Sequence, residues 1–199
     1  MKKYIAILAV LSFLMFSCSD ETLDRTIFIP DEDNRSLPAY TEWGYNSFGA
    51  VYERRNFVAA NHIVPCKIVY QNGMLNFSLI GVQQSVSGQT ALTFSFPLSE
   101  VETIADLAVL HEMEINLTQN STVTLEENNV ETTLNVLGGT LHFKRFQLLR
   151  VDDKINRIIL SGTFEIRFLR NGRPESISNG RFDLGITDRD FINLTNIEF

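Results

Sequence analysis

From Ser47 onward, apolar and polar residues alternate along the chain with a period of two. The clearest run is 158–168, where every even position is apolar or glycine and most odd positions are polar. Successive side chains of a strand point to opposite faces of its sheet. The run therefore predicts a strand with one buried and one wet face, which is typical of an antiparallel sheet.

Turn residues separate these alternating runs. Asn72-Gly73 and Asn171-Gly172 lie between pairs of runs, and both residue types tolerate the positive φ of a tight hairpin turn. Asp152-Asp153 predicts a further turn before the long run. The alternation changes phase between Ile177 and Phe182, with Asn179-Gly180 in between, which predicts a β-bulge at Gly180.

The remaining alternating runs complete an all-β pattern. They cover 48–52, 57–59, 66–70, 75–79, 92–96, 113–117, 123–125, 134–136 and 141–148. Roughly ten strands at this spacing predict one antiparallel sandwich or barrel, and the pattern does not choose between the two. Gly138-Gly139 separates two of the predicted strands, and Glu126-Glu127 with Asn128-Asn129 predicts a loop.

One short helix is expected in this domain. Ser99 and Glu102 have the spacing of a capping box, and the apolar residues after them follow a helical step. We therefore expect a helix over Glu100–Leu110, lying across one end of the β structure.

The first 17 residues have the organisation of a bacterial lipoprotein signal peptide. Lys2 and Lys3 precede the uncharged apolar stretch Ile5–Phe16, and Ser17 stands directly before Cys18. The stretch is shorter than the roughly 20 residues that cross a bilayer core. The tetrapeptide ending at Cys18 resembles a lipobox, which implies cleavage before Cys18 and lipidation of its sulfur. The alternatives are an uncleaved signal anchor and a soluble secreted protein with a coincidental cysteine.

Residues 18–41 are polar and acidic and predict a tether, which leaves 42–199 as a single all-β domain. Ser19-Asp20-Glu21 resembles the surface-display signal of lipoproteins from Bacteroidetes-type bacteria, and a plain solvated linker is the alternative. The expected location is the outer membrane, lipid-anchored and facing either the cell surface or the periplasm. The apolar island Ile27-Phe28-Ile29 is able to pack on the domain as a strand.

Composition narrows the classes of partner. The 199-residue chain is 44% hydrophobic and 21% charged, as expected of a globular fold, and its net charge is -7. An acidic surface repels phosphate backbones, so nucleic-acid binding is disfavoured and membrane attachment requires the lipid anchor. With Cys18 lipidated, Cys66 has no cysteine to pair with, so the core is held by packing alone.

Three segments carry a resemblance to a known family. Ile159–Phe164 and Ile177–Asp183, joined through an Asn-Gly turn, are similar to the C-terminal signature of an uncharacterised lipoprotein family of Bacteroidetes. Asn46–Val58 is similar to that family's opening hairpin. The resemblance implies an all-β domain on a lipid anchor and supplies no activity and no functional residues.

No catalytic or metal-binding arrangement stands out, so we expect neither an enzyme nor a cofactor. His62, His111 and His142 fall in different predicted elements. His111-Glu112 begins like a zinc-protease motif, but Ile115 stands where the second histidine ligand belongs. There is no Gly-x-Ser-x-Gly elbow, and Cys66 lies in an alternating apolar strand, where a small core residue is expected.

The strongest candidate for binding is an aromatic cluster. Tyr40, Trp43 and Tyr45 crowd the junction between tether and domain, and Trp43 is the only tryptophan. Exposed aromatic faces stack on sugar rings or fill interface pockets, whereas buried ones plug the end of a β core.

These residues lead to two main hypotheses of function. The first is a ligand-binding module for a glycan or another small nutrient, which requires exposed aromatics beside a concave surface. The second is a structural or envelope-protein interaction module, which requires a long uncovered sheet edge or a large apolar patch. An enzyme ranks last.

Overall fold

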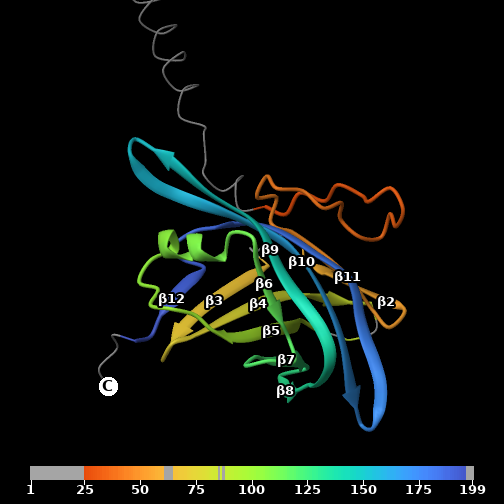
Figure 1. Cartoon of the computed structure of the whole chain (residues 1–199). Coiled ribbons are helices and arrows are strands. Elements are labelled where there is room, and N and C mark those ends of the chain that lie inside the picture. The colour runs from red at the N-terminus through yellow and green to blue at the C-terminus, as the bar shows by residue number, and fades with distance from the viewer. Residues whose placement is uncertain (1–24, 61–64, 85, 87, 196–199) are drawn as a thin grey trace, which may run out of the picture.

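The computed structural model describes residues 25–60, 65–84, 86 and 88–195 and confirms an all-β fold (Figure 1). The predicted signal peptide, the lipidation site Cys18 and the start of the tether lie outside the described residues. The described residues form twelve strands and a short 3-10 helix, η2. In chain order these are β1 (Ser47–Tyr52), β2 (Arg55–Ala59), β3 (Cys66–Gln71), β4 (Met74–Gln83), β5 (Thr90–Pro97), η2 (Ile104–Leu110), β6 (Met113–Asn116), β7 (Thr122–Glu127), β8 (Val130–Thr133), β9 (Asn135–Val151), β10 (Lys154–Arg170), β11 (Arg173–Ile186) and β12 (Phe191–Asn193).

All twelve strands belong to one curled sheet. Ten of them follow the order β6-β9-β10-β11-β1-β2-β4-β5-β7-β8, and β3 pairs with β4 and with β12. Every pairing is antiparallel except that of β12 with β3. Within the described residues β6 and β8 do not pair with each other, so the sheet is open, with these two strands at its ends.

Ring contacts across the interior show how far the sheet curls. The ring of Phe77 on β4 lies 5.3 Å from that of Phe143 on β9 and 5.1 Å from that of Phe182 on β11. Phe94 on β5 lies 5.4 Å from Phe164 on β10. Strands β4 and β5 therefore face β9 to β11 across one phenylalanine-rich core, which excludes water from both walls.

The structure confirms the predicted hairpin turns and the predicted buried faces of the strands. Asn72-Gly73 joins β3 to β4 with φ of 52° and 77°, and Asn171-Gly172 joins β10 to β11 with φ of 52° and 75°. Two successive positive φ angles give a type I′ turn, whose twist matches that of the flanking strands. Cys66 is 5% exposed on the inner face of β3, and burial raises the pKa of its thiol well above the usual value.

The predicted bulge in β11 is also confirmed. The pairing of β10 with β11 passes from Phe164↔Gly180 to Ile166↔Ile177, which leaves an extra residue on β11 around Asn179, whose φ is 53°. A bulge bends its strand and increases the local twist. It therefore contributes to the curl that closes β11 over the core.

Three sequence-based expectations were wrong. Gly138-Gly139 does not end a strand, because both residues lie within β9, which pairs with β10 almost throughout. Glu126 and Glu127 belong to β7, and only Asn128-Asn129, with φ of 54° and 62°, makes the turn.

The third correction concerns the helix, which begins at Ile104 and not at Glu100. Leu98 and Val101 are buried in the core, which holds the preceding chain in an irregular path. The carboxylate of Asp106 then accepts hydrogen bonds from the backbone N–H groups of Glu102 and Thr103, at 3.1 and 2.8 Å, and so fixes the start.

Candidate functional site

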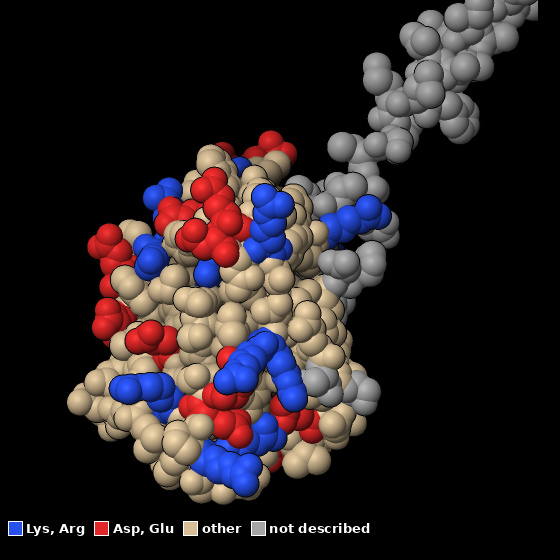
Figure 2. Space-filling view, turned by 90° about the vertical axis from the view of Figure 1, so that its right-hand side faces the viewer, with Lys and Arg blue, Asp and Glu red and all other residues tan. Residues whose placement is uncertain are grey.

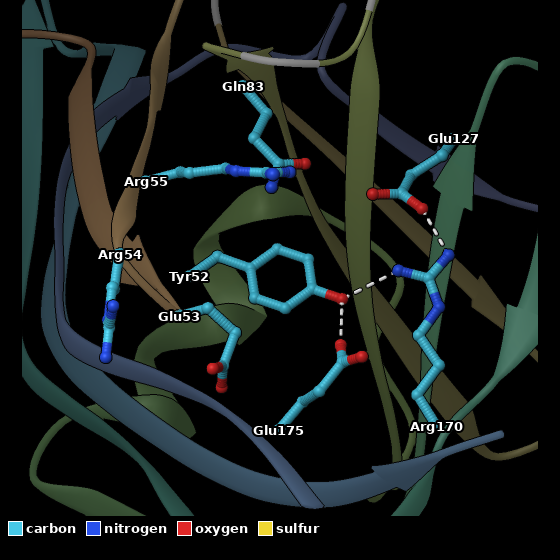
Figure 3. Close-up of a pocket in the computed structure, with 8 residues that line it drawn as sticks. All are labelled: Tyr52, Glu53, Arg54, Arg55, Gln83, Glu127, Arg170 and Glu175. Atoms are coloured by element: carbon cyan, nitrogen blue, oxygen red, sulfur yellow. Dashed lines mark hydrogen bonds and ion pairs between the residues drawn. The ribbon is translucent and has the colours of Figure 1, made fainter. Parts of the chain in front are cut away.

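A polar cavity of about 390 Å³ opens at one end of the curled sheet (Figure 3). Its walls come from the β1–β2 turn, the ends of β4 and β7, and the β10–β11 hairpin. The lining residues are Tyr52, Glu53, Arg54, Arg55, Gln83, Glu127, Arg170 and Glu175. Its volume is within the range of small-molecule sites. In Figure 2, basic and acidic side chains lie close together at the lower end of the face shown.

The fold assembles this cavity from segments far apart in the sequence. Tyr52 pairs with Arg55 in the β1–β2 hairpin, and Gln83 on β4 pairs with Phe57, two residues beyond Arg55. Glu127 ends β7, which lies on the opposite wall from the β10–β11 hairpin. None of these residues formed a recognisable pattern in the sequence, because only the curl of the sheet brings them together.

A hydrogen-bonded network spans the two walls of the cavity. The Tyr52 hydroxyl donates to Glu175 Oε2 at 2.5 Å and accepts from Arg170 Nη1 at 2.7 Å. Arg170 Nη2 also forms an ion pair with Glu127. Burial, followed by the hydrogen bond to Glu175, raises the pKa of the Tyr52 phenol. The hydrogen bond to Glu127 raises the pKa of Arg170, so Tyr52 is neutral and Arg170 charged at neutral pH.

Other polar groups of the cavity remain unengaged. Gln83 is 5% exposed, and its Oε1 has no hydrogen-bond partner among the described residues. Figure 3 shows its amide turned into the cavity, on the side where Arg55 lies. The guanidinium groups of Arg54 and Arg55 likewise have no hydrogen-bond or ion-pair partner in the part of the chain that the structure describes. A buried amide without a partner is costly, and a ligand group is able to satisfy it.

The predicted aromatic cluster lies elsewhere, on the loop that leads into β1. Trp43 is 71% exposed, whereas Tyr40 and Tyr45 are half-buried. The Tyr40 hydroxyl donates to Glu42 Oε1 at 2.9 Å, and Lys144 Nζ lies 5.0 Å from the centre of its ring. None of the three lines the cavity of Figure 3. Their role in ligand binding stays a prediction.

One buried carboxylate holds this loop in place. Asp183 on β11 is 1% exposed, and its oxygens accept four hydrogen bonds from the loop. They come from the Thr41 hydroxyl at 2.5 Å and from the backbone N–H groups of Trp43, Gly44 and Tyr45 at 3.1, 2.7 and 3.2 Å. No local pattern indicates this role, since Asp183 lies about 140 residues from its partners.

The described part of the predicted tether also packs on the domain. Leu37 is fully buried, and Asp31 forms an ion pair of 2.5 Å with Arg181 on β11. Ile27 and Ile29 make backbone hydrogen bonds with Tyr45 and Ala39, although the island they belong to is not a named strand.

The described residues also bear on metal binding and on membrane spanning. Between residues 25 and 195, apart from the gaps stated above, no group of three or more His, Cys, Asp or Glu is placed to hold a metal ion. His111 accepts a hydrogen bond from the Phe146 N–H at 3.3 Å, and His62 lies outside the described residues. Across these ranges, no helix has both the length and the apolar character needed to span a bilayer.

Comparison of the chain with family models, with curated proteins and with solved structures finds no match. The resemblance to a Bacteroidetes lipoprotein family therefore stays a prediction that rests on sequence segments alone.

Proposed function

We propose that this chain is a non-catalytic lipoprotein of the outer membrane that binds a small polar ligand, such as a glycan or another nutrient. The Cys18 anchor would attach it to the membrane, and the cavity at the end of the sheet would hold the ligand. The observation that carries the proposal is the unpartnered Gln83 amide oxygen in a polar cavity.

The arrangement of charges suits binding more than chemistry. One wall of the cavity is held rigid by hydrogen bonds and an ion pair among its own side chains. These are the side chains of Tyr52, Glu127, Arg170 and Glu175. Burial of Tyr52 and the hydrogen bond of Arg170 to Glu127 account for the raised pKa values of the two groups without a catalytic role. Preformed walls lower the entropy cost of holding a ligand.

The unengaged groups indicate the ligand class. Arg54 and Arg55 offer guanidinium donors to a carboxylate or to hydroxyl oxygens, and Gln83 Oε1 requires a donor such as a hydroxyl. The Tyr52 ring is only 4% exposed, so it offers no platform for stacking. An acidic sugar, which carries both a carboxylate and several hydroxyls, meets these requirements best.

The test is a calorimetric titration of the full chain in detergent against neutral sugars, uronic acids and amino acids. We expect a uronic acid to bind, and Arg55→Met to weaken that binding at least tenfold, or about 1.4 kcal/mol. Arg150→Met is the matched control, because Arg150 is an exposed arginine of the β9–β10 hairpin. Equal affinity for both variants would contradict the cavity as the site.

A further variant separates the cavity from the aromatic cluster. Loss of binding in Trp43→Ala, with Arg55→Met unaffected, would move the site to the loop of Tyr40, Trp43 and Tyr45. Absence of heat with every member of the panel would count against small-ligand binding as the function.

The alternative is a structural or protein-interaction module of the envelope. The observation in its favour is β8, which ends the sheet with all four residues exposed, including Val130 at 65%. Because this edge is short and carries mostly polar residues, it supports strand addition less well than the cavity supports ligand binding.

A further inference from the structure

We infer that Trp43 and the segment Ile27–Ile29 form a contact surface for the membrane to which the chain is anchored. This inference goes beyond ligand binding and rests on the proposed lipid anchor at Cys18. The surface would set the orientation of the domain, with the cavity turned away from the bilayer.

The first argument is the clustering of exposed apolar side chains. Ile27, Phe28 and Ile29 are 48, 45 and 41% exposed, and Trp43 is 71% exposed. Backbone hydrogen bonds place them on one loop structure, because the Ile27 N–H donates to Tyr45 O at 2.8 Å and the Ala39 N–H to Ile29 O at 2.7 Å. Scattered exposed apolar residues need no explanation, whereas four on one loop fit an interaction surface.

The second argument is that the loop is rigidly mounted. Asp183 accepts hydrogen bonds from the backbone N–H groups of Trp43 and Tyr45. Arg181 pairs with Asp31 and also donates to Pro38 O at 3.4 Å. Both anchors lie on β11, so the exposed indole projects from a fixed backbone. Presenting a tryptophan to water in this way has no benefit for packing.

The third argument is the position of the surface relative to the anchor. Arg25, where the described chain begins, is seven residues after Cys18 and two before Ile27. Seven residues span at most about 25 Å, so an acylated Cys18 keeps this surface close to the lipid. Tryptophan favours the membrane–water interface, where an amphipathic ring meets both the polar headgroups and the acyl chains.

The opposite end of the domain carries the cavity. Asp183 and Glu175 on β11 pair with Ser161 and Phe168 on β10. These partners are seven residues apart, which corresponds to about 23 Å along a strand. Figure 1 shows the loop of residues 25–45 at the upper end and the β10–β11 hairpin at the lower end. A membrane contact at the loop would therefore leave the ligand cavity open to the solvent.

The charge of this loop indicates which type of lipid headgroup it fits. The loop of residues 25–45 carries four carboxylates, on Asp31, Glu32, Asp33 and Glu42, against the two cations Arg25 and Arg35. Its net charge of 2 − 4 = −2 opposes anionic headgroups. The surface fits a zwitterionic headgroup region, into which the apolar side chains insert, and not a strongly anionic one.

The single tryptophan makes the inference directly measurable. The full chain is purified from membranes and reconstituted into phosphatidylcholine vesicles with brominated acyl chains, which quench indole fluorescence on contact. We expect Trp43 emission to shift to the blue and to fall at least threefold relative to unbrominated vesicles. The control moves the reporter in a Trp43→Phe, Val130→Trp variant, because Val130 is 65% exposed on β8. Its emission should stay unquenched.

Each other outcome overturns the inference. Equal quenching of both reporters would show that the domain lies on the membrane without a preferred face, and unquenched Trp43 would show that the loop does not reach the lipid. Mass spectrometry of the same sample tests the lipid anchor separately from the contact surface. A diacylated chain with unquenched Trp43 refutes only the contact surface, whereas an unacylated chain refutes the anchor as well.

Discussion

The carboxylate of Asp183 should be one of the most costly polar groups to alter in this domain. Replacement by asparagine keeps the size of the side chain but removes its charge, and it turns one acceptor oxygen into an NH₂ donor. The loop of residues 41–45 presents four donors to this group. At least one of them must then face another donor.

The magnitude follows from the geometry. A hydrogen bond to a charged group contributes about 1.5–3 kcal/mol, and one between neutral groups about 0.5–1.5 kcal/mol. Three weakened bonds and one donor left without an acceptor would together cost about 4–6 kcal/mol. Partial release of the loop into water recovers some of this, since Thr41, Trp43 and Tyr45 are not fully buried. We expect Asp183→Asn to lower the free energy of unfolding by about 3–5 kcal/mol.

The assay is urea unfolding of the full chain in detergent, followed by Trp43 fluorescence and by far-UV circular dichroism. Trp43 reports on the loop, whereas dichroism reports on the sheet, so the two signals separate local release from global unfolding. Asp153→Asn is the control, because Asp153 is exposed in the β9–β10 turn and its φ of 62° suits asparagine. A loss below about 1 kcal/mol for Asp183→Asn by both probes would refute the assigned role.

Two further predictions concern packing and pH. Gly162→Ala should lower the free energy of unfolding in urea by about 3 kcal/mol, because a Cβ there would lie 2.1 Å from the backbone oxygen of His142. Gly138→Ala is the control, and it should cost less than about 1 kcal/mol, because its Cβ would meet only the flexible Arg167 side chain, at 3.1 Å. Equal losses would contradict this account. Burial, with the Glu42 carboxylate, raises the pKa of Tyr40 from 10.0 to about 12, so the folded state holds this proton more tightly than the unfolded state. The contribution of Tyr40 to stability should be complete below pH 10 and disappear as the pH rises toward 12. The difference in phenolate absorbance between wild type and Tyr40→Phe should show this late titration, and a midpoint near pH 10 would contradict the prediction.

The sequence by itself determined most of the strands, their buried faces and most of their turns, although it did not predict β8 and β12. Alternation is a local property, so residues such as Ile68, Phe77 and Phe94 indicate the inner face without reference to the rest of the fold. Asn-Gly pairs predict hairpin turns for the same reason, because the positive φ they tolerate is a property of the residues themselves. The bulge at Asn179 was visible as a change of phase along one strand.

Elements whose bounds depend on distant residues were harder to predict from the sequence. The start of η2 was misplaced because burial of Leu98 and Val101 overrides the local capping signal at Ser99. The Gly138-Gly139 pair predicts an interruption, although β9 continues through it and stays paired with β10 on both sides. In both places tertiary packing outweighed a weak local preference.

Only the tertiary structure decided the cavity and the presentation of Trp43. Arg170 and Glu127 meet because the sheet curls until β10 faces β7, and curvature accumulates from twist and bulges that no short segment encodes. Trp43 was recognised in the sequence as the single tryptophan, but its exposure depends on Asp183, which binds the loop from β11. Local periodicity specifies which face of a strand is buried, whereas the meeting of distant polar groups depends on the path of the whole sheet.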